Sequence, residues 1–218
     1  MHMSNVRNML AKVAPVYQAG LFGAGSLTTL DPSFKGMERI YLEDGCWIDW
    51  LPGWVKGADA LFERLVTGRP WARRSRWMYD LQVLEPRMTD HWHVGCGYPL
   101  DCPEVDAMRL ALAKHYAAPF DSVGFNLYRD GSDSIAWHRD RITADIVEPI
   151  VPLVSLGEPR QLRFRKVGGG KSRAFGFGHG DLLVTGGLTQ RRWEHAVLKV
   201  AKAGPRISIG FRWGREPR

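Results

Sequence analysis

Two histidines and one aspartate have the residue types and the spacing of a metal site. His138 and Asp140 lie two residues apart, and His195 follows 55 residues after Asp140. If residues 135–140 form a strand, the side chains of His138 and Asp140 leave the same face and converge. Two imidazoles and one carboxylate leave three positions open on a metal, an arrangement typical of non-heme Fe(II) oxygenases. Because a His-x-Asp pair also arises by chance, an ordinary core or surface histidine remains the alternative at this point.

Two arginines near the end of the chain predict a site for an anion. Arg206 and Arg212 are six residues apart, so on a regular strand both side chains point to one side. The planar guanidinium group suits bidentate binding of a carboxylate. A dicarboxylate would satisfy both arginines, whereas an edge strand whose arginines reach water is the structural alternative.

The elements that must position these residues are mainly strands. The pattern predicts a hairpin over Met37–Leu51 that turns at Asp44-Gly45. Short apolar runs separated by Gly, Pro and Asp predict further strands. These lie near Ser122–Tyr128, Ile135–Arg139, Ile150–Leu156, Gln161–Lys166, Phe175–Phe177, Asp181–Thr185, His195–Leu198 and Arg206–Trp213.

Two helices are predicted in the first half of the chain. The first runs over Ala58–Val66 and stops before Gly68. The second is expected to be capped by Asp101, with Pro103 in its first turn and an end before Pro119. Short strands with helices gathered in the first half predict a mainly β (α+β) fold, in which two sheets carry the helices on their outside.

Composition places the chain among globular proteins of one domain. It has 218 residues, of which 44% are hydrophobic and 24% charged, and this excludes a disordered or disulfide-scaffold class. The longest apolar runs are far shorter than the roughly 20 residues that cross a bilayer, so no transmembrane helix is expected. Cys46, Cys96 and Cys102 have neither zinc-like nor redox-motif spacing, and no apolar signal segment begins the sequence. We therefore expect a cytoplasmic protein.

Positive charge is concentrated in the second half of the chain. The net charge is +7, of which residues 1–100 carry +1 and residues 101–218 carry +6. The stretch 160–173 contains six Lys or Arg and no acidic residue. Such a segment could contact phosphates, although a solvated strand pair would have the same composition.

One segment resembles a known family. The run Asn126-Leu-Tyr-Arg-Asp-Gly-Ser-Asp-Ser-Ile-Ala-Trp-His-Arg-Asp140 is similar to the Asn-x-Tyr, Gly, His-x-Asp block of the AlkB-type Fe(II) and 2-oxoglutarate-dependent oxygenases, which reverse alkylation damage on nucleobases. Further blocks follow in the family's order, and together they cover about residues 120–213. These blocks are Pro149–Gly157, His179-Gly180-Asp181, Trp193-Glu194-His195 and the stretch from Pro205 to Arg212.

The resemblance implies a fold and a division of the chain. The fold would be a double-stranded β-helix, or jelly roll, with supporting helices. The chain would form a single domain, with residues 1–119 as an N-terminal extension that includes a nucleotide-recognition lid. Residues 120–213 would form the catalytic core.

The resemblance also implies roles for individual residues. His138, Asp140 and His195 would hold Fe(II). Arg206 with Tyr128 would bind the distal carboxylate of 2-oxoglutarate. Its carboxylate and keto end, near the metal, would be held by Arg212 and Asn126.

The reaction that the resemblance implies is oxidative demethylation. With Fe(II), 2-oxoglutarate and O2, an N-methyl group on a base of DNA, or of RNA, would leave as formaldehyde while succinate and CO2 form. The base must be single-stranded or flipped out of a duplex. Trp92 and Tyr98 are candidates for stacking on it, and Arg163 and Arg165 are candidates for phosphate contacts. We expect the protein to act as a monomer.

Two departures from the family pattern concern the substrate. Ile142 stands where many relatives have an acidic residue that helps to hold a cationic base, and Ser208 stands where relatives commonly have Asn. A tRNA, a free nucleotide or a protein side chain therefore stays open as the substrate. From other classes, a non-catalytic nucleic-acid-binding β domain and a partner-binding jelly roll also stay open.

Overall fold

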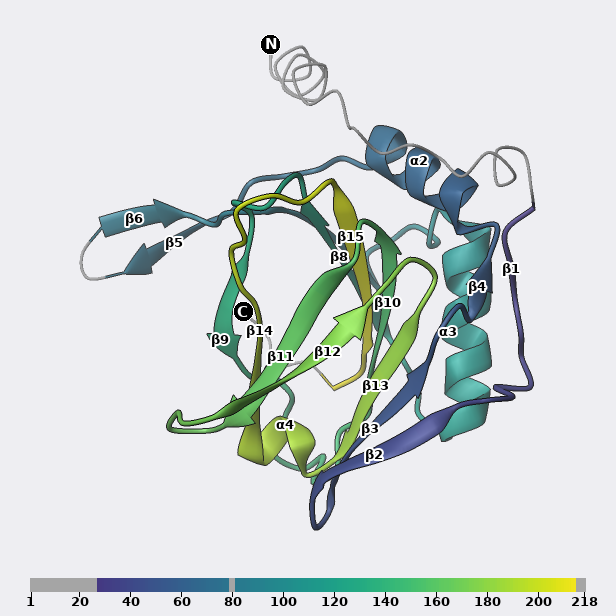
Figure 1. Ribbon diagram of the computed structural model, residues 1–218. Coiled ribbons are helices and arrows are strands. Elements are labelled where there is room, and N and C mark those ends of the chain that lie inside the picture. The colour runs from purple at the N-terminus through teal and green to yellow at the C-terminus, as the bar shows by residue number, and fades with distance from the viewer. Residues whose placement is uncertain (1–26, 79–80, 215–218) are drawn as a thin grey trace.

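Two antiparallel sheets lie face to face in the computed structural model, which describes residues 27–78 and 81–214 (Figure 1). The large sheet has, in spatial order, β2 (Glu38–Glu43), β3 (Cys46–Leu51), β13 (Leu182–Gly187), β10 (Val151–Gly157), β15 (Arg206–Arg212), β8 (Ser122–Tyr128) and β7 (Met88–His93). The small sheet has β12 (Ser172–Phe177), β11 (Arg160–Lys166), β14 (Trp193–Val197) and β9 (Ile135–His138). This architecture confirms the predicted jelly roll with helices outside.

Helices cover the outer face of the large sheet. They are α2 (Ala58–Gly68) and α3 (Pro103–Tyr116), and Figure 1 shows both on the side away from the small sheet. Their buried side chains form one apolar core with the outward residues of the large sheet, whereas a second core lies between the two sheets. The large sheet is therefore covered on both faces, which explains why β10 and β13 are buried at every position.

Two small sheets and one short helix complete the described structure. The strands β1 (Thr29–Leu30) and β4 (Val55–Lys56) pair with each other. The strands β5 (Ser75–Met78) and β6 (Leu81–Leu84) form a hairpin that projects from the body in Figure 1. The short helix α4 (Thr189–Arg192) joins β13 to β14.

Sequence reasoning located the hairpin and both long helices but missed details at their ends. The turn at Asp44-Gly45 joins β2 to β3 as predicted. The first helix continues through Gly68 instead of stopping before it. The predicted cap by Asp101 is wrong: the N-cap residue of α3 is Cys102, which makes no side-chain capping bond. Asp101 instead accepts a hydrogen bond at 2.8 Å from the guanidinium of Arg69.

Several elements were not predicted at all. The strand β7 has too many polar residues for a clear alternation, and β5, β6 and α4 are short. Since β2, β3 and β7 belong to the large sheet, residues before 120 contribute three of its strands. The sheet therefore does not divide at the predicted boundary of the N-terminal extension.

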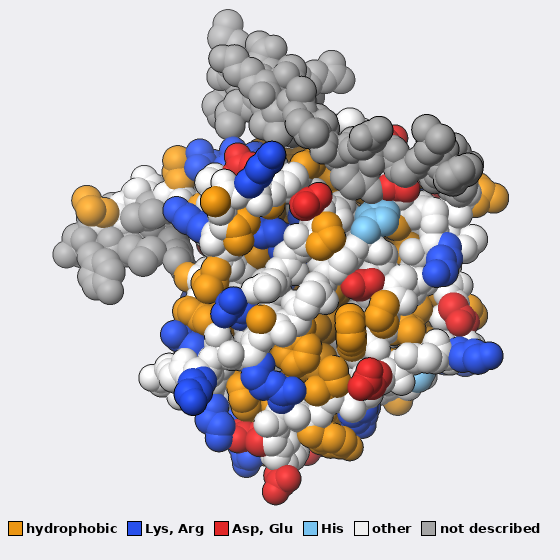
Figure 2. Space-filling view, in the orientation of Figure 1, with side chains coloured by type: hydrophobic (Ala, Val, Ile, Leu, Met, Phe, Trp, Pro, Cys, Tyr) orange, Lys and Arg blue, Asp and Glu red, His pale blue; other side chains and the backbone are white. Residues whose placement is uncertain are grey.

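Positive charge is unevenly distributed over the surface. Basic side chains in Figure 2 lie mainly over the half of the visible face formed by the small sheet, interspersed with a few acidic ones. No described helix is long and apolar enough to cross a membrane. All three cysteines are free thiols.

Candidate metal and cosubstrate site

The three predicted metal ligands meet between the two sheets. His138 ends β9 and lies directly opposite His195 of β14 in the strand register, and Asp140 follows two residues after His138. One ligand atom from each of the three residues lies within 4.8 Å of the others. The imidazole centroids of the two histidines are 4.2 Å apart. A single ion can therefore reach all three side chains.

Both histidines are prepared to bind a metal through a neutral ring. The Nδ1 atom of His138 lies 2.8 Å from the carbonyl oxygen of Ala136, and a carbonyl can only accept a hydrogen bond. Nδ1 therefore carries the proton, which leaves Nε2 free to coordinate. Burial lowers the pKa of His138, and burial together with the neighbouring His138 lowers the pKa of His195 to about 3. Near neutral pH both rings are in the form that coordinates a cation.

Asp140 has one oxygen that a cation would satisfy. Its Oδ1 accepts a contact at 3.0 Å from Nη2 of Arg212, whereas its Oδ2 is buried and has no hydrogen-bond partner within the described ranges. Burial acts to raise the pKa of Asp140, but Arg212 and the two imidazoles outweigh it and hold the pKa below its ordinary value. An ionised, buried oxygen without a donor is costly unless an ion compensates it. This donor set fits a metal.

A glutamine on α4 supports Asp140 and was missed from the sequence. The backbone N–H of Asp140 donates to Oε1 of Gln190 at 3.1 Å, and Nε2 of Gln190 donates to Oγ1 of Thr185 at 2.9 Å. Gln190 is buried, so this pair of hydrogen bonds fixes the backbone beside the metal ligands. No sequence pattern indicates it, because the contact joins residues 50 positions apart.

The strand β15 presents different residues on its two faces. Its apolar residues Ile207, Ile209 and Phe211 are fully buried in the core beneath the helices. The alternate positions, which include Ser208 and Gly210, face the small sheet. Arg206 and Arg212 lie at the two ends of that inner row, as the sequence predicted.

Two paired glycines make room for Arg212. Gly210 of β15 pairs with Gly124 of β8, and a Cβ atom at Gly210 would lie 2.6 Å from Nη1 of Arg212. The guanidinium of Arg212 therefore folds back over this gap, where it reaches Asp140. A larger residue at position 210 would displace it.

Arg206 is a buried cation with no acidic partner among the described residues. It is 1% exposed, its Nε donates to Oγ of Ser155 at 2.8 Å, and its Nη1 has no hydrogen-bond partner in the described part of the chain. The rings of Tyr128 and Phe177 each have their centroid 5.2 Å from the guanidinium carbon. Burial lowers the pKa of Arg206 to about 10, opposed by Tyr128, so the group stays charged at neutral pH. A carboxylate ligand would satisfy this cation.

Asn126 lies beside this row on β8. In the register of the large sheet it pairs with Ser208 of β15 on one side and with Thr89 of β7 on the other. Its Oδ1 accepts a hydrogen bond at 2.9 Å from Nε of Arg87. The structure thus brings all four predicted cosubstrate residues onto one surface, with Arg87 as an additional neighbour.

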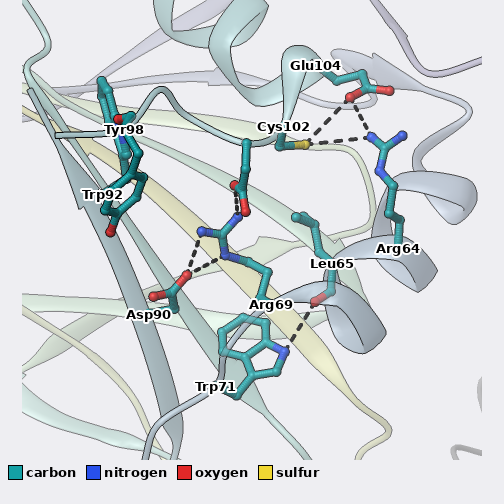
Figure 3. A network of polar contacts seen from close by, with 10 residues as sticks. Arg64, Leu65, Arg69, Trp71, Asp90, Trp92, Tyr98, Cys102 and Glu104 are labelled. Atoms are coloured by element: carbon teal, nitrogen blue, oxygen red, sulfur yellow. Dashed lines mark hydrogen bonds and ion pairs between the residues drawn. The ribbon is translucent and has the colours of Figure 1, made fainter. Parts of the chain in front are cut away.

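The two predicted base-stacking residues are neighbours but differ in exposure. Trp92 is 7% exposed in the core between β7 and the helices, so it offers no free face to a base. Its indole N–H donates to the carbonyl oxygen of Tyr98 at 3.0 Å (Figure 3). Tyr98 lies in the loop after β7 and is 59% exposed. A stacking role for Trp92 is therefore wrong, whereas one for Tyr98 stays a prediction.

A polar network in the same region ties β7 to both helices. The side chain of Arg69 is 7% exposed, and its Nε donates to Oδ2 of Asp90 on β7 at 2.6 Å (Figure 3). The same guanidinium binds Asp101, just before α3. Because Arg69 follows directly after α2, this one residue links the edge strand to the start of one helix and the end of the other.

Arg163 and Arg165 do not line the metal site. Phe164 pairs with His195 and shares its face of the small sheet, so its neighbours Arg163 and Arg165 point to the opposite face. Arg165 pairs with Glu194 at 2.9 Å, and Arg163 donates to the side chains of Ser172 and Gln161. A role for Arg163 and Arg165 in contacting the phosphates of a nucleic acid stays a prediction, because their face of the small sheet is the one opposite the metal ligands.

Comparison with known proteins assigns the family. A family model described as the 2OG-Fe(II) oxygenase superfamily matches residues 80–212. The chain belongs to this superfamily. Membership implies Fe(II), 2-oxoglutarate and O2, which the donor set described above fits.

The curated relatives to which the chain is similar are AlkB-type proteins. It is 28% identical over 191 residues to "Alpha-ketoglutarate-dependent dioxygenase alkB homolog 3" of Bos taurus, a match that covers 74% of this chain and 64% of the relative. The Homo sapiens protein of the same description is 27% identical, with 81% and 66% covered. "DNA oxidative demethylase ALKBH2" of Arabidopsis thaliana is 26% identical, with 97% and 77% covered. The chain thus spans slightly under two thirds of the length of the alkB homolog 3 proteins.

A solved structure supports the fold. The structure described as "The structure of OsALKBH1" superposes with a TM-score of 0.54 at 18% sequence identity, over 80% of this chain and 99% of that one. At this level of identity the similarity concerns the jelly roll alone.

Proposed function

We propose that this enzyme oxidatively demethylates N-alkylated bases in nucleic acid, with single-stranded or flipped-out DNA as the main substrate and RNA as a further one. The proposal rests on a cluster of metal-binding side chains at the small sheet that faces two arginines of the large sheet. A compact His138, Asp140 and His195 cluster lies within reach of Arg212, and Arg206 is a buried cation without an acid. The similarity to a protein described as a DNA oxidative demethylase supports the substrate class.

The residues would divide the cosubstrate between them. His138, Asp140 and His195 would hold Fe(II), which supplies activation of O2 coupled to oxidative decarboxylation of 2-oxoglutarate. Arg206 would bind the distal carboxylate, with a hydrogen bond from the hydroxyl of Tyr128. The guanidinium of Arg212 would bind the other end, because it already lies next to a metal ligand.

The walls of the site would exclude water. The ring of Phe164 lies 5.9 Å from the ring of His195, and Leu153, Phe177 and Leu183 belong to the same buried cluster between the sheets. A dry surrounding strengthens each charge interaction with the cosubstrate and limits side reactions. Apolar side chains from both sheets, beside the two arginines of β15, suit a small dianion that lies between the sheets.

The overall reaction balances without a further reductant. One oxygen atom of O2 enters succinate as 2-oxoglutarate loses CO2, and the other converts the N-methyl group to an N-hydroxymethyl group. The C–N bond of that group then breaks, which releases formaldehyde and returns the proton to the base nitrogen. Two electrons come from the keto acid and two from the methyl C–H bond.

Charge and exposure favour a nucleic-acid substrate. The chain carries a net charge of +7, and basic side chains extend over the small-sheet half of the surface (Figure 2). A base in a duplex cannot reach a metal between two sheets, so it must be unpaired first. Tyr98 offers an exposed ring at the loop after β7 and is our candidate for stacking on it.

The described site contains no acidic side chain at position 142 that would bind a cationic base. Ile142 is 4% exposed and packs with Ile146 and Val151, so it offers no charge to a methylated base. A neutral lesion would suit this site as well as 1-methyladenine or 3-methylcytosine.

The test is a coupled assay of cosubstrate turnover and demethylation. The full chain is incubated with Fe(II), 2-oxoglutarate and O2, together with a single-stranded DNA oligonucleotide that carries 3-methylcytosine. Unmodified DNA and methylated RNA of the same sequence serve as comparisons. We expect succinate to form in step with the loss of methyl mass, and the Asp140→Ala variant to do neither. Succinate without demethylation of any methylated oligonucleotide would overturn the nucleic-acid assignment and favour a nucleotide or protein substrate.

A further inference from the structure

Arg87 joins the projecting β5–β6 hairpin to the predicted cosubstrate site. It lies just before β7, and its side chain is 12% exposed. On one side its Nε donates to Oδ1 of Asn126 at 2.9 Å. On the other side its Nη2 lies 3.0 Å from Oε2 of Glu85, the residue that follows β6. The three side chains thus form a continuous chain of charged and polar contacts.

The contact with Arg87 determines which way the amide of Asn126 points. A guanidinium has only donors, so it can bind the amide oxygen and not the amide nitrogen. With Oδ1 held by Arg87, the two N–H donors of Asn126 lie on the other arm of the amide. A carboxylate needs donors, so this is the orientation that the cosubstrate requires. A rotation by half a turn would instead place the amide oxygen against the carboxylate.

Because Arg87 is already paired with Glu85, we expect it to orient Asn126 and not to bind the cosubstrate itself. The carboxylate of Glu85 neutralises Arg87, whereas Arg206 has no acidic partner among the described side chains. Arg87 reaches the site through Asn126, which lies opposite Ser208, between Arg206 and Arg212 on the same face of β15. It is therefore close enough to shape the site but already paired.

We propose that Arg87, anchored by Glu85, is a positioning residue that fixes the amide of Asn126 with its N–H donors toward the 2-oxoglutarate carboxylate. The inference rests on the proposed cosubstrate site but not on the identity of the methylated substrate. It also places a residue at the base of the hairpin in direct contact with a cosubstrate ligand.

The test measures 2-oxoglutarate binding directly and without turnover. The full chain is loaded with Mn(II) in place of iron, and the Kd for 2-oxoglutarate is measured by titration calorimetry. The variants are Arg87→Met, Asn126→Ala and the double variant. Arg109→Met is the matched control, because Arg109 is 19% exposed and paired with Asp106 on α3, outside the sheets. Thermal melting of each variant confirms that it is folded, and Arg87→Leu, which also lacks a donor, replaces Arg87→Met if the latter does not fold.

We expect Arg87→Met to weaken 2-oxoglutarate binding about tenfold, the equivalent of ~1.4 kcal/mol. In the Asn126→Ala background the same change should alter the Kd less than about twofold, because the effect passes through the amide. With iron, the KM for 2-oxoglutarate should rise while kcat stays nearly constant. Arg109→Met should bind like the wild type.

Three outcomes would overturn the inference. Unchanged binding by Arg87→Met would show that the amide needs no support from Arg87. A full effect of Arg87→Met in the Asn126→Ala background would show that Arg87 acts on the cosubstrate itself. In both cases the proposed demethylation would stand, whereas a wild-type chain that does not bind 2-oxoglutarate would remove the proposed cosubstrate site as well.

Discussion

Replacing Arg206 by methionine should make the ligand-free protein more stable while it abolishes 2-oxoglutarate binding. Most substitutions of fully buried residues destabilise a protein. Arg206 is an exception because it is a charge that the fold buries without an acidic partner. Methionine is unbranched and of similar length, so it can fill much of the same space without the charge.

The magnitude follows from the cost of the charge and the contacts that offset it. Burial lowers the pKa of Arg206 from 12.5 to about 10, which corresponds to a penalty of ~3 kcal/mol on the charged form. The attraction of Tyr128 is already included in this pKa, but the substitution also removes the hydrogen bond to Ser155, which contributes about 1 kcal/mol, and the contact with the ring of Phe177, which contributes ~0.5–1 kcal/mol. The net gain is ~1–2 kcal/mol, or a rise in Tm of roughly 3–6 °C for a chain of this size.

The assay is thermal and urea denaturation of the metal-free protein, with and without 2-oxoglutarate. Arg160→Met is the matched control. Arg160 is 5% exposed, but its guanidinium donates to the carbonyl oxygens of Asp130, Asp133 and Leu198. Its loss should lower the free energy of unfolding by ~2–4 kcal/mol, because three buried carbonyls lose their donor. If Arg206→Met is destabilised as strongly as Arg160→Met, the buried guanidinium of Arg206 is not a net cost to the stability of the ligand-free fold.

Three further predictions concern the metal, the pH and the backbone. Asp140→Asn should lower metal affinity at least about 100-fold in equilibrium dialysis while the chain stays folded, and retention of metal would count against the triad. Burial lowers the pKa of His179, whose Nδ1 accepts the N–H of Gly157 at 2.8 Å, so the unfolded chain takes up the proton more readily. The free energy of unfolding should therefore fall as the pH drops from about 7 to 5. In urea denaturation, His179→Asn should lose less of this free energy over the same range than the wild type. An equal loss would show that His179 does not cause the pH dependence. Gly157→Ala should lower the free energy of unfolding by ~3 kcal/mol, since the φ of Gly157 is +88° and a Cβ would lie 2.5 Å from the carbonyl oxygen of Pro205. Gly169→Ala, where φ is +105° and the space around the Cβ is open, should lower it by only about 1 kcal/mol. Similar losses in the two variants would show that the crowding at Gly157 is unimportant.

Strand periodicity explains why the metal ligands could be predicted. The two-residue spacing of His138 and Asp140 is a local property, and an extended backbone turns it into a shared direction. The same rule places Arg206 and Arg212 on one face of β15 across six residues. Periodicity does not indicate which strand lies opposite. His195 was therefore proposed as the third ligand from its residue type and the family resemblance, and its pairing with His138 was not predicted.

The substrate-binding residues were predicted from residue type and not from side-chain direction. Arg163 and Arg165 were selected for charge, but their neighbour Phe164 takes the face toward the metal, which turns both arginines away. Trp92 was selected as an aromatic ring, but β7 joins the large sheet and directs that ring into the core. Arg87 was passed over because its role depends on contacts with residues two and 39 positions away. Each of these directions and contacts depends on sheet pairing, which composition does not reveal.

Two atoms without partners connect the stability of this fold to its chemistry. Oδ2 of Asp140 and Nη1 of Arg206 are buried, carry opposite charge and have no hydrogen-bond partner in the described structure. Both reduce the stability of the ligand-free chain, and each is satisfied by a different ligand, the metal in one case and a carboxylate in the other. Because Arg212 contacts Asp140, the group that would hold one end of the cosubstrate already touches a metal ligand. Metal binding to Asp140 changes what Arg212 can bind, so the affinities for metal and 2-oxoglutarate should be coupled, and each ligand should raise Tm more in the presence of the other.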